Sequence, residues 1–222
     1  MRTPIKICCI QDEEEAQLAV ACGADALGLV SEMPSGWGPI PEETIGRIAK
    51  TIPPCVTSVL LTSKSTANDI IAQQQITQCN AIQIVDAFPI EDYARLRQAL
   101  PGITILQAVH VFGDESISHA QQVAPHVDGL ILDTGSPHGA EVRVLGGTGL
   151  THDWNVSAAI VQAVSTPVFL AGGLKNHNIE EAIQTTRPYG IDLCTGVRTN
   201  TKLDEDKLRA FMSAARHAAR SI

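Results

Sequence analysis

Short apolar runs alternate with longer amphipathic runs along almost the whole chain. The apolar runs are rich in Val, Ile and Leu, which is typical of buried strands, and they predict strands at residues 5–9, 26–30, 56–61, 81–85, 104–111, 129–133, 168–171 and 191–194. Each is followed by a run with the 3.6-residue period of a helix, at residues 12–22, 42–50, 66–75, 90–100, 116–123, 154–164, 176–185 and 204–219. The chain therefore repeats one strand–helix unit from end to end.

Strands that are apolar throughout and joined by helices indicate a parallel sheet with both faces covered. Eight such units in 222 residues favour a closed α/β barrel, the (β/α)8 TIM barrel, over an open doubly wound sheet, because the units are evenly spaced. No linker or low-complexity segment interrupts the pattern, so we predict one domain spanning residues 1–222.

Composition and charge disfavour several classes of partner. The net charge of −8 and the 4% of aromatic residues argue against binding to nucleic acid or to an anionic membrane. No apolar run reaches the roughly 20 residues that span a bilayer, and the first residues lack the pattern of a signal peptide, so we expect a cytoplasmic protein.

The six cysteines, at positions 8, 9, 22, 55, 79 and 194, form no CxxC pair and show no zinc-ligand spacing. Most lie in apolar runs, which favours reduced thiols. We therefore expect neither a metal nor an organic cofactor.

Two polar residues at strand ends are candidates for proton transfer. In a (β/α)8 barrel the active site lies at the C-terminal ends of the strands, where the first strand ends at Cys8 and Cys9 and the sixth ends at Asp133 in "GLILD". A thiolate with a lowered pKa can remove a proton, and a carboxylate at the end of a buried strand is costly unless it is paired or used. Cys8 and Asp133 therefore form a candidate base and acid; the alternative for Asp133 is a helix cap or a turn-forming role before Gly135.

The alternation of side chains along a strand bears on the neighbours of Cys8. Lys6 shares the face of Cys8, so it either promotes the Cys8 thiolate or fills a lower layer of the barrel. Cys9 is expected to face away from the interior if Cys8 faces the site; the exchanged phase is the alternative. Asp192 lies inside the eighth strand, where we expect a structural hydrogen-bonding role.

Glycine-bearing turns follow the seventh and eighth strands. "AGGL" contains Gly172 and Gly173, and "CTGV" contains Thr195 and Gly196. Bare backbone N–H groups at these two strands fit the recurrent phosphate site of the barrel, although tight turns alone also require glycine. The longest loop carries "GGTG", whose Gly147 and Gly149 are further candidates for phosphate binding.

These segments resemble the phosphoribosylanthranilate isomerase family of tryptophan biosynthesis almost from end to end. "KICCI" is similar to the family's "KICGI", "LILDT" to "LLLDT" and "GGTGLTHDW" to "GGTGKTFDW". "VFLAGGLKNHNIEEAI" is similar to "VILAGGLTPENVAEAI", and "RPYGIDLCTGVRT" to "RPYGVDVSSGVES". The GGTG…DW and AGGL segments together are highly specific.

The resemblance implies an Amadori rearrangement of an aminoaldose phosphate to an aminoketose phosphate, without a cofactor. It assigns the general base to Cys8 and the general acid to Asp133, and phosphate binding to Gly172, Gly173 and Gly196. The partner is then a small sugar-phosphate substrate, with the chain a monomer or a homodimer.

Four positions depart from the family's motifs. Cys9 replaces a glycine, Val85 replaces the histidine of "QLHG", and Arg198 replaces the glutamate of "SSGVE". In the loop "MPSGWGPIP", Trp37 stands near the place of an arginine that pairs with the anthranilate carboxylate. We expect Trp37, Gln83 and Arg198 on the aglycone side, with Trp37 stacking on an aromatic ring and Arg198 supplying a charge.

Three hypotheses follow for the function. The first is an isomerase of phosphoribosylanthranilate or a closely related aminoaldose phosphate. The second is a paralogous barrel that acts on a different phosphorylated metabolite. The third is a non-catalytic barrel that binds a phosphate ligand, which would need neither Cys8 nor Asp133 for proton transfer.

Overall fold

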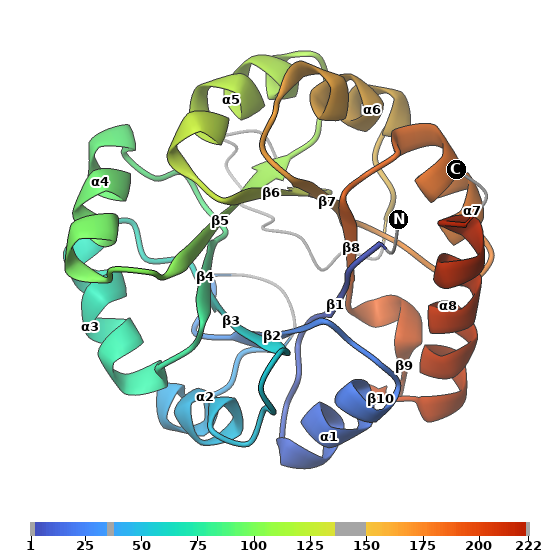
Figure 1. The fold of residues 1–222 in the computed structure, drawn as a ribbon, viewed down its shortest axis with the longest axis horizontal. Helices are drawn as coiled ribbons and strands as arrows, with labels where there is room; N and C mark the ends of the chain where they lie inside the picture. Colours follow the sequence, from blue (N-terminus) through green and yellow to red (C-terminus); the bar gives the residue numbers. More distant parts are fainter. Residues whose placement is uncertain (1–2, 35–37, 136–149, 221–222) are drawn as a thin grey trace.

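The computed structural model describes residues 3–34, 38–135 and 150–220. Its central strands form a closed barrel in sequence order, and every neighbouring pair is parallel, including β1 with β8 (Figure 1). The strands are β1 (Ile5–Ile7), β2 (Ala26–Val30), β3 (Thr57–Thr62), β4 (Ala81–Ile84), β5 (Thr104–His110), β6 (Gly129–Asp133), β7 (Val168–Leu170) and β8 (Gly190–Leu193). The predicted (β/α)8 barrel is confirmed.

The helices surround this barrel on the outside, one after each strand (Figure 1). They are α1 (Glu13–Ala21), α2 (Glu42–Ala49), α3 (Ala67–Thr77), α4 (Ile90–Ala99), α5 (Glu115–Val123), α6 (Trp154–Ala163), α7 (Ile179–Thr186) and α8 (Glu205–Ala218). Four of them begin at a polar side chain that accepts a backbone N–H of the first turn, namely Asp12, Thr66, Asp153 and Asp204. Sequence periodicity predicts every one of these helices.

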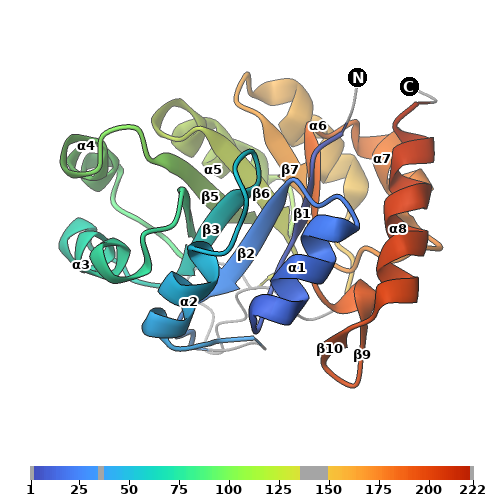
Figure 2. The ribbon, with the colours of Figure 1, turned by 60° about the horizontal axis from the view of Figure 1, so that its bottom comes forward.

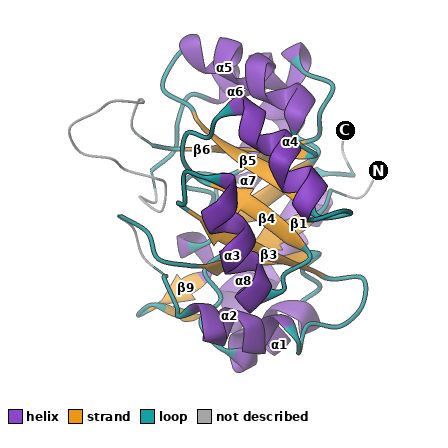
Figure 3. Cartoon of the chain, turned by 90° about the vertical axis from the view of Figure 1, so that its left-hand side faces the viewer, coloured by secondary structure: helices purple, strands orange, loops and turns teal. Residues whose placement is uncertain are grey.

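A small hairpin between β8 and α8 has no counterpart in the predicted pattern. A 3-10 turn at Thr195–Val197 leads into β9 (Arg198–Thr199), which pairs antiparallel with β10 (Lys202–Leu203). The hairpin lies at the C-terminal end of the barrel strands, and the two chain termini lie near the other end (Figures 2 and 3). It therefore lies at the end of the barrel where the candidate residues are expected.

Two apolar clusters form the core. The larger one lies between the strands and the surrounding helices. The smaller one fills the inside of the barrel and consists of Cys8, Cys9, Val30, Val59, Leu61, Ala81, Val85, Leu106, Ala108, Ile131 and Ala171. Within the described ranges, no helix combines the length and apolar character needed to cross a membrane.

Candidate active site

The thiols of Cys8 and Cys9 lie where the chain leaves β1. The strand itself ends at Ile7, and the Cys8 N–H donates to the Leu193 carbonyl oxygen of β8 at 2.8 Å. Both cysteines are buried and belong to the cluster inside the barrel. The prediction that Cys9 faces away from the interior was therefore wrong.

The backbone of Cys9 explains this difference. Its φ of +63° lies in the left-handed region, beyond the end of the strand, so the two-residue alternation of side chains no longer applies. This conformation costs a residue with a Cβ atom about 1–2 kcal/mol. Glycine, the residue of the "KICGI" motif at this place, avoids that cost.

A buried ion pair lies next to the Cys8 thiol inside the barrel. Lys6 Nζ donates to Asp192 Oδ2 at 2.7 Å, and both side chains are almost completely buried. A Cβ atom on Gly28 of β2 would lie 2.8 Å from Cys8 Sγ and 3.1 Å from Lys6 Nζ. The thiol and the ammonium therefore both pack against this glycine, and Asp192 has the structural role expected of it.

These surroundings lower the pKa of the Cys8 thiol. A hydrogen bond with the Cys9 thiol makes the largest contribution and stabilises the Cys8 thiolate. Burial destabilises the thiolate, and the Lys6 ammonium stabilises it. The pKa of Cys9 is raised well above its usual value by hydrogen bonds with Cys194 and Cys8 and by burial. Cys8 is thus the thiol that ionises first, with Cys9 as its hydrogen-bond donor.

Asp133 ends β6 at the same end of the barrel, and it has the opposite shift. Burial raises the pKa of its carboxyl group to about 7, against the effect of the Thr134 N–H, which donates to Asp133 Oδ1 at 2.7 Å. The negative charge of Asp192 raises it further, and the Lys6 ammonium opposes this. Near neutral pH a large share of Asp133 therefore carries a proton that it can donate.

The glycine turns after β7 and β8 are tightly packed. Gly172 and Gly173 have φ values of +78° and +63°, and a Cβ atom on Gly172 would lie 2.5 Å from Thr134 Oγ1. A Cβ atom on Gly196, next to Thr195 in the 3-10 turn, would collide with the Leu174 carbonyl oxygen. The turns after β6, β7 and β8 thus contact one another through glycine backbone.

Three residues of the expected site lie outside the described residues: Gly147, Gly149 and Trp37. Their roles stay predictions from the sequence.

His152 contacts Thr134, the residue that follows Asp133, and is not among the candidates predicted from the sequence. Its Nδ1 lies 3.1 Å from Thr134 Oγ1 and its Nε2 lies 2.7 Å from Ser157 Oγ. Burial lowers the pKa of His152 to about 4, with the nearby Asp153 opposing the shift, so the imidazole is neutral. His152 precedes α6 in a loop that has no hydrophobic periodicity. The one sequence feature that could have indicated a role is its place in the family-like segment "THDW".

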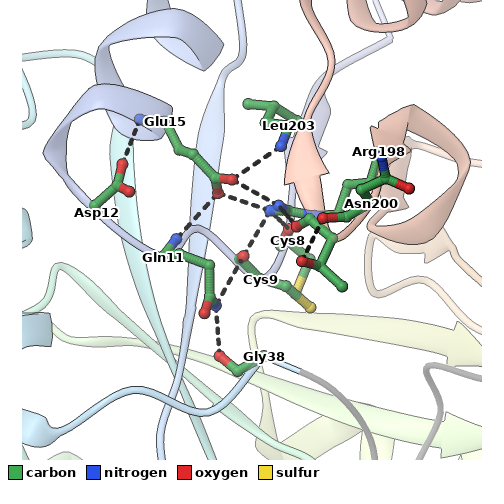
Figure 4. Close-up of polar contacts among 10 residues, drawn as sticks. Cys8, Cys9, Gln11, Asp12, Glu15, Gly38, Arg198, Asn200 and Leu203 are labelled. Atoms are coloured by element: carbon green, nitrogen blue, oxygen red, sulfur yellow. Dashed lines mark hydrogen bonds and ion pairs between the residues drawn. The ribbon is translucent and has the colours of Figure 1, made fainter.

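Two residues expected on the aglycone side have different surroundings. Gln83 of β4 is buried, and its Oε1 has no hydrogen-bond partner among the described residues. Arg198 is also buried, and its guanidinium forms an ion pair with Glu15 of α1 at 2.8 Å (Figure 4). The expectation that Arg198 supplies a charge to the substrate is corrected, because that charge is already paired with Glu15.

Comparisons with known proteins agree over nearly the whole chain. A family model described as N-(5'phosphoribosyl)anthranilate (PRA) isomerase matches residues 5–214. The N-(5'-phosphoribosyl)anthranilate isomerase of Methanocella arvoryzae is 33% identical over 215 residues, which cover 96% of this chain and 98% of that protein. The enzyme of the same name from Haloferax volcanii is 34% identical over 222 residues, covering 99% and 96%.

Solved structures of proteins from this family superpose on nearly the whole chain. Phosphoribosyl anthranilate isomerase from Thermotoga maritima superposes with a TM-score of 0.83 at 28% identity, covering 97% of this chain and 99% of that one. A phosphoribosyl anthranilate isomerase in complex with reduced 1-(o-carboxyphenylamino)-1-deoxyribulose 5-phosphate superposes with a TM-score of 0.81 at 26% identity and the same coverage.

Proposed function

Since the chain belongs to the N-(5'-phosphoribosyl)anthranilate isomerase family, we propose that it isomerises phosphoribosylanthranilate in tryptophan biosynthesis, with Cys8 as general base and Asp133 as general acid. The observation that carries these two roles is the opposite direction of their pKa shifts at one end of the barrel. A non-catalytic barrel would need neither shift. The family match favours this substrate over another phosphorylated metabolite.

The proposed reaction moves two protons. Protonated Asp133 donates its proton to the ring oxygen of the aminoaldose phosphate, the bond from that oxygen to C1 breaks, and an iminium ion forms. The Cys8 thiolate then removes the proton from C2, which gives an enolamine. Tautomerisation of the enolamine yields the aminoketose phosphate, and proton exchange with solvent returns both groups to their starting states.

The residues around Cys8 have supporting roles in this proposal. The Cys9 thiol and the Lys6 ammonium stabilise the thiolate that performs the second step. Asp192 holds Lys6 at 2.7 Å, so the ammonium stays charged and buried.

The two ends of the substrate have separate binding regions in this proposal. Backbone N–H groups near Gly172, Gly173, Thr195 and Gly196 bind the phosphate, together with Gly147 and Gly149 of the longest loop. Trp37 stacks on the anthranilate ring, and the buried Gln83 Oε1 accepts a hydrogen bond from the substrate. The chain acts as a monomer or a homodimer.

Complementation tests this function in a cell. A strain that lacks its own phosphoribosylanthranilate isomerase should grow without tryptophan when it carries the native chain. Cys8→Ala and Asp133→Ala should each fail to support growth, because loss of a general base or acid lowers the rate by about 100-fold or more. Cys22→Ala, which removes a thiol remote from the site, is the matched control and should support growth. Absence of growth with the native, folded chain would contradict the proposed function.

A further inference from the structure

We propose that Arg198 is a positioning residue for the base: together with Glu15 it holds the Cys8–Cys9 turn in the geometry that proton transfer requires. This inference rests on the proposed function of Cys8. Arg198 touches neither the substrate nor the reacting sulfur in this proposal; it acts through the backbone of Cys9.

The ion pair is buried and bidentate. Arg198 Nη1 lies 2.8 Å from Glu15 Oε1, and Nη2 donates to Glu15 Oε2 at 2.9 Å. The two side chains are 4% and 11% exposed. Two parallel hydrogen bonds fix the plane of the guanidinium, which a single contact would leave free to rotate.

The fixed guanidinium points at the turn that carries the base. Arg198 Nη2 donates to the Cys9 carbonyl oxygen at 2.6 Å and lies 3.5 Å from that of Cys8 (Figure 4). Gln11 Nε2 also donates to the Cys9 carbonyl oxygen, at 3.2 Å. Two donors on one carbonyl oxygen hold the Cys9 peptide in its left-handed conformation, which a residue with a Cβ atom adopts only when its surroundings impose it.

Glu15 joins this turn to the rest of the rim. It accepts the Gln11 N–H at 3.1 Å and the Leu203 N–H of the β9–β10 hairpin at 2.9 Å (Figure 4). Arg198 itself directly follows the Thr195–Val197 turn, which is proposed to bind phosphate. One ion pair thus connects the base to the turn that anchors the other end of the substrate.

Two departures from the family motifs meet at this contact. Cys9 stands where "KICGI" has glycine, and Arg198 stands where "SSGVE" has glutamate. The Cys9 thiol is the hydrogen-bond partner that favours the Cys8 thiolate most. Arg198 therefore maintains, through the Cys9 carbonyl, a thiol–thiol contact that a glycine at position 9 cannot make.

The variant that tests this role is Arg198→Lys, which keeps the buried positive charge beside Glu15 but loses the two-pronged geometry. We expect kcat for phosphoribosylanthranilate to fall about tenfold or more, with KM changed less than about threefold. The low-pH limb of the kcat/KM profile should move to higher pH. Double substitution of the exposed Arg209–Glu205 pair, R209M with E205Q, is the matched control and should leave kcat and the profile unchanged.

A double-mutant cycle separates positioning from general stability. In a Cys9→Gly background the contact that Arg198 maintains is absent, so Arg198→Lys should lower kcat less than about threefold there. A purely structural ion pair would instead lower kcat equally in both backgrounds, and that result would overturn the inference.

A readout that does not need turnover keeps the inference distinct from the proposed function. The pKa of the Cys8 thiol can be followed by iodoacetamide alkylation across pH, with Cys8 identified by peptide mass spectrometry. Arg198→Lys should raise this pKa, and a folded variant with an unchanged Cys8 pKa and unchanged kcat would refute the positioning role. A native chain without isomerase activity, but with the shifted alkylation profile in the variant, would refute only the function.

Discussion

At the scale of single residues, the most informative position is Cys9, a non-glycine residue with φ of +63° and a buried thiol. Its backbone conformation turns the side chain into the barrel, where the thiol can donate to Cys8. The same conformation stores about 1–2 kcal/mol of strain relative to glycine. At position 9, a cysteine therefore makes the backbone less stable than a glycine would, but its thiol forms a hydrogen bond with the base.

This strain is measurable with two substitutions at one site. Because both Cys9→Gly and Cys9→Ala remove the thiol, they differ only in the Cβ atom, and the glycine variant should have the higher free energy of unfolding, by about 1 kcal/mol. Denaturant unfolding measures the difference. The same pair at Cys22, where φ is −79°, is the control and should show the opposite order. Equal stabilities of the two variants at position 9 would mean that the position is unstrained.

The pKa of Asp133, raised to about 7 by burial, predicts a pH dependence of stability. The folded state holds a proton that the unfolded state releases near pH 4, so the stability contributed by protonated Asp133 is lost as the pH rises towards about 7. Asp133→Asn removes this loss. The free energy of unfolding of the variant should therefore exceed that of the parent increasingly between about pH 4 and pH 7, by up to about 4 kcal/mol. If the difference in free energy of unfolding between the variant and the parent does not change with pH, the pKa of Asp133 is not raised in the folded protein.

The candidate site residues could be predicted only where they lie at the C-terminal end of a strand that the sequence pattern itself predicts. Cys8 directly follows β1 and Asp133 is the last residue of β6, so the barrel pattern alone places both residues at the same end of the barrel. The orientation of Cys9 could not be predicted, because side chains alternate only within a strand and β1 ends at Ile7, two residues earlier. His152 could not be found either, because its contacts with Thr134 and Ser157 arise in a loop without periodicity.

At the scale of elements, the turns after β7 and β8 determine the proposed phosphate site. Gly196 lies so close to the Leu174 carbonyl oxygen that any side chain there would push the two turns apart. Such a shift would move the backbone N–H groups proposed to hold the phosphate.

A substitution in this turn should thus act on substrate binding. Gly196→Ala should raise KM for phosphoribosylanthranilate about tenfold, because its Cβ atom meets rigid backbone, with a smaller effect on kcat. Steady-state kinetics measure both constants. Gly102→Ala is a suitable control, because Gly102 has a positive φ but a Cβ atom there would meet no heavy atom within 4 Å. An unchanged KM in the Gly196 variant would argue against a phosphate at this turn.

The regular elements were predictable because each carries its own periodic pattern. The apolar strands and the capped helices are local features, as at Asp12 and Asp204, whose side chains accept backbone N–H groups of α1 and α8. The β9–β10 hairpin was missed because its strands have two residues each, too few to show a period.

At the scale of the whole molecule, closure of the barrel brings together residues from opposite ends of the sequence. Lys6 pairs with Asp192, and Glu15 pairs with Arg198, because β1 lies beside β8 and α1 lies near the β9–β10 hairpin. The fold was predictable from the repeat of eight units. The partner of Arg198 was not, because no local pattern connects positions 183 residues apart.

The most direct test of the central claim is the loss of phosphoribosylanthranilate fluorescence catalysed by the purified chain. We predict turnover by the native protein. For the folded Cys8→Ala, Asp133→Ala double variant we predict a rate that is lower by a factor of about 1,000 or more. A native protein that consumes the substrate no faster than this variant would contradict the claim.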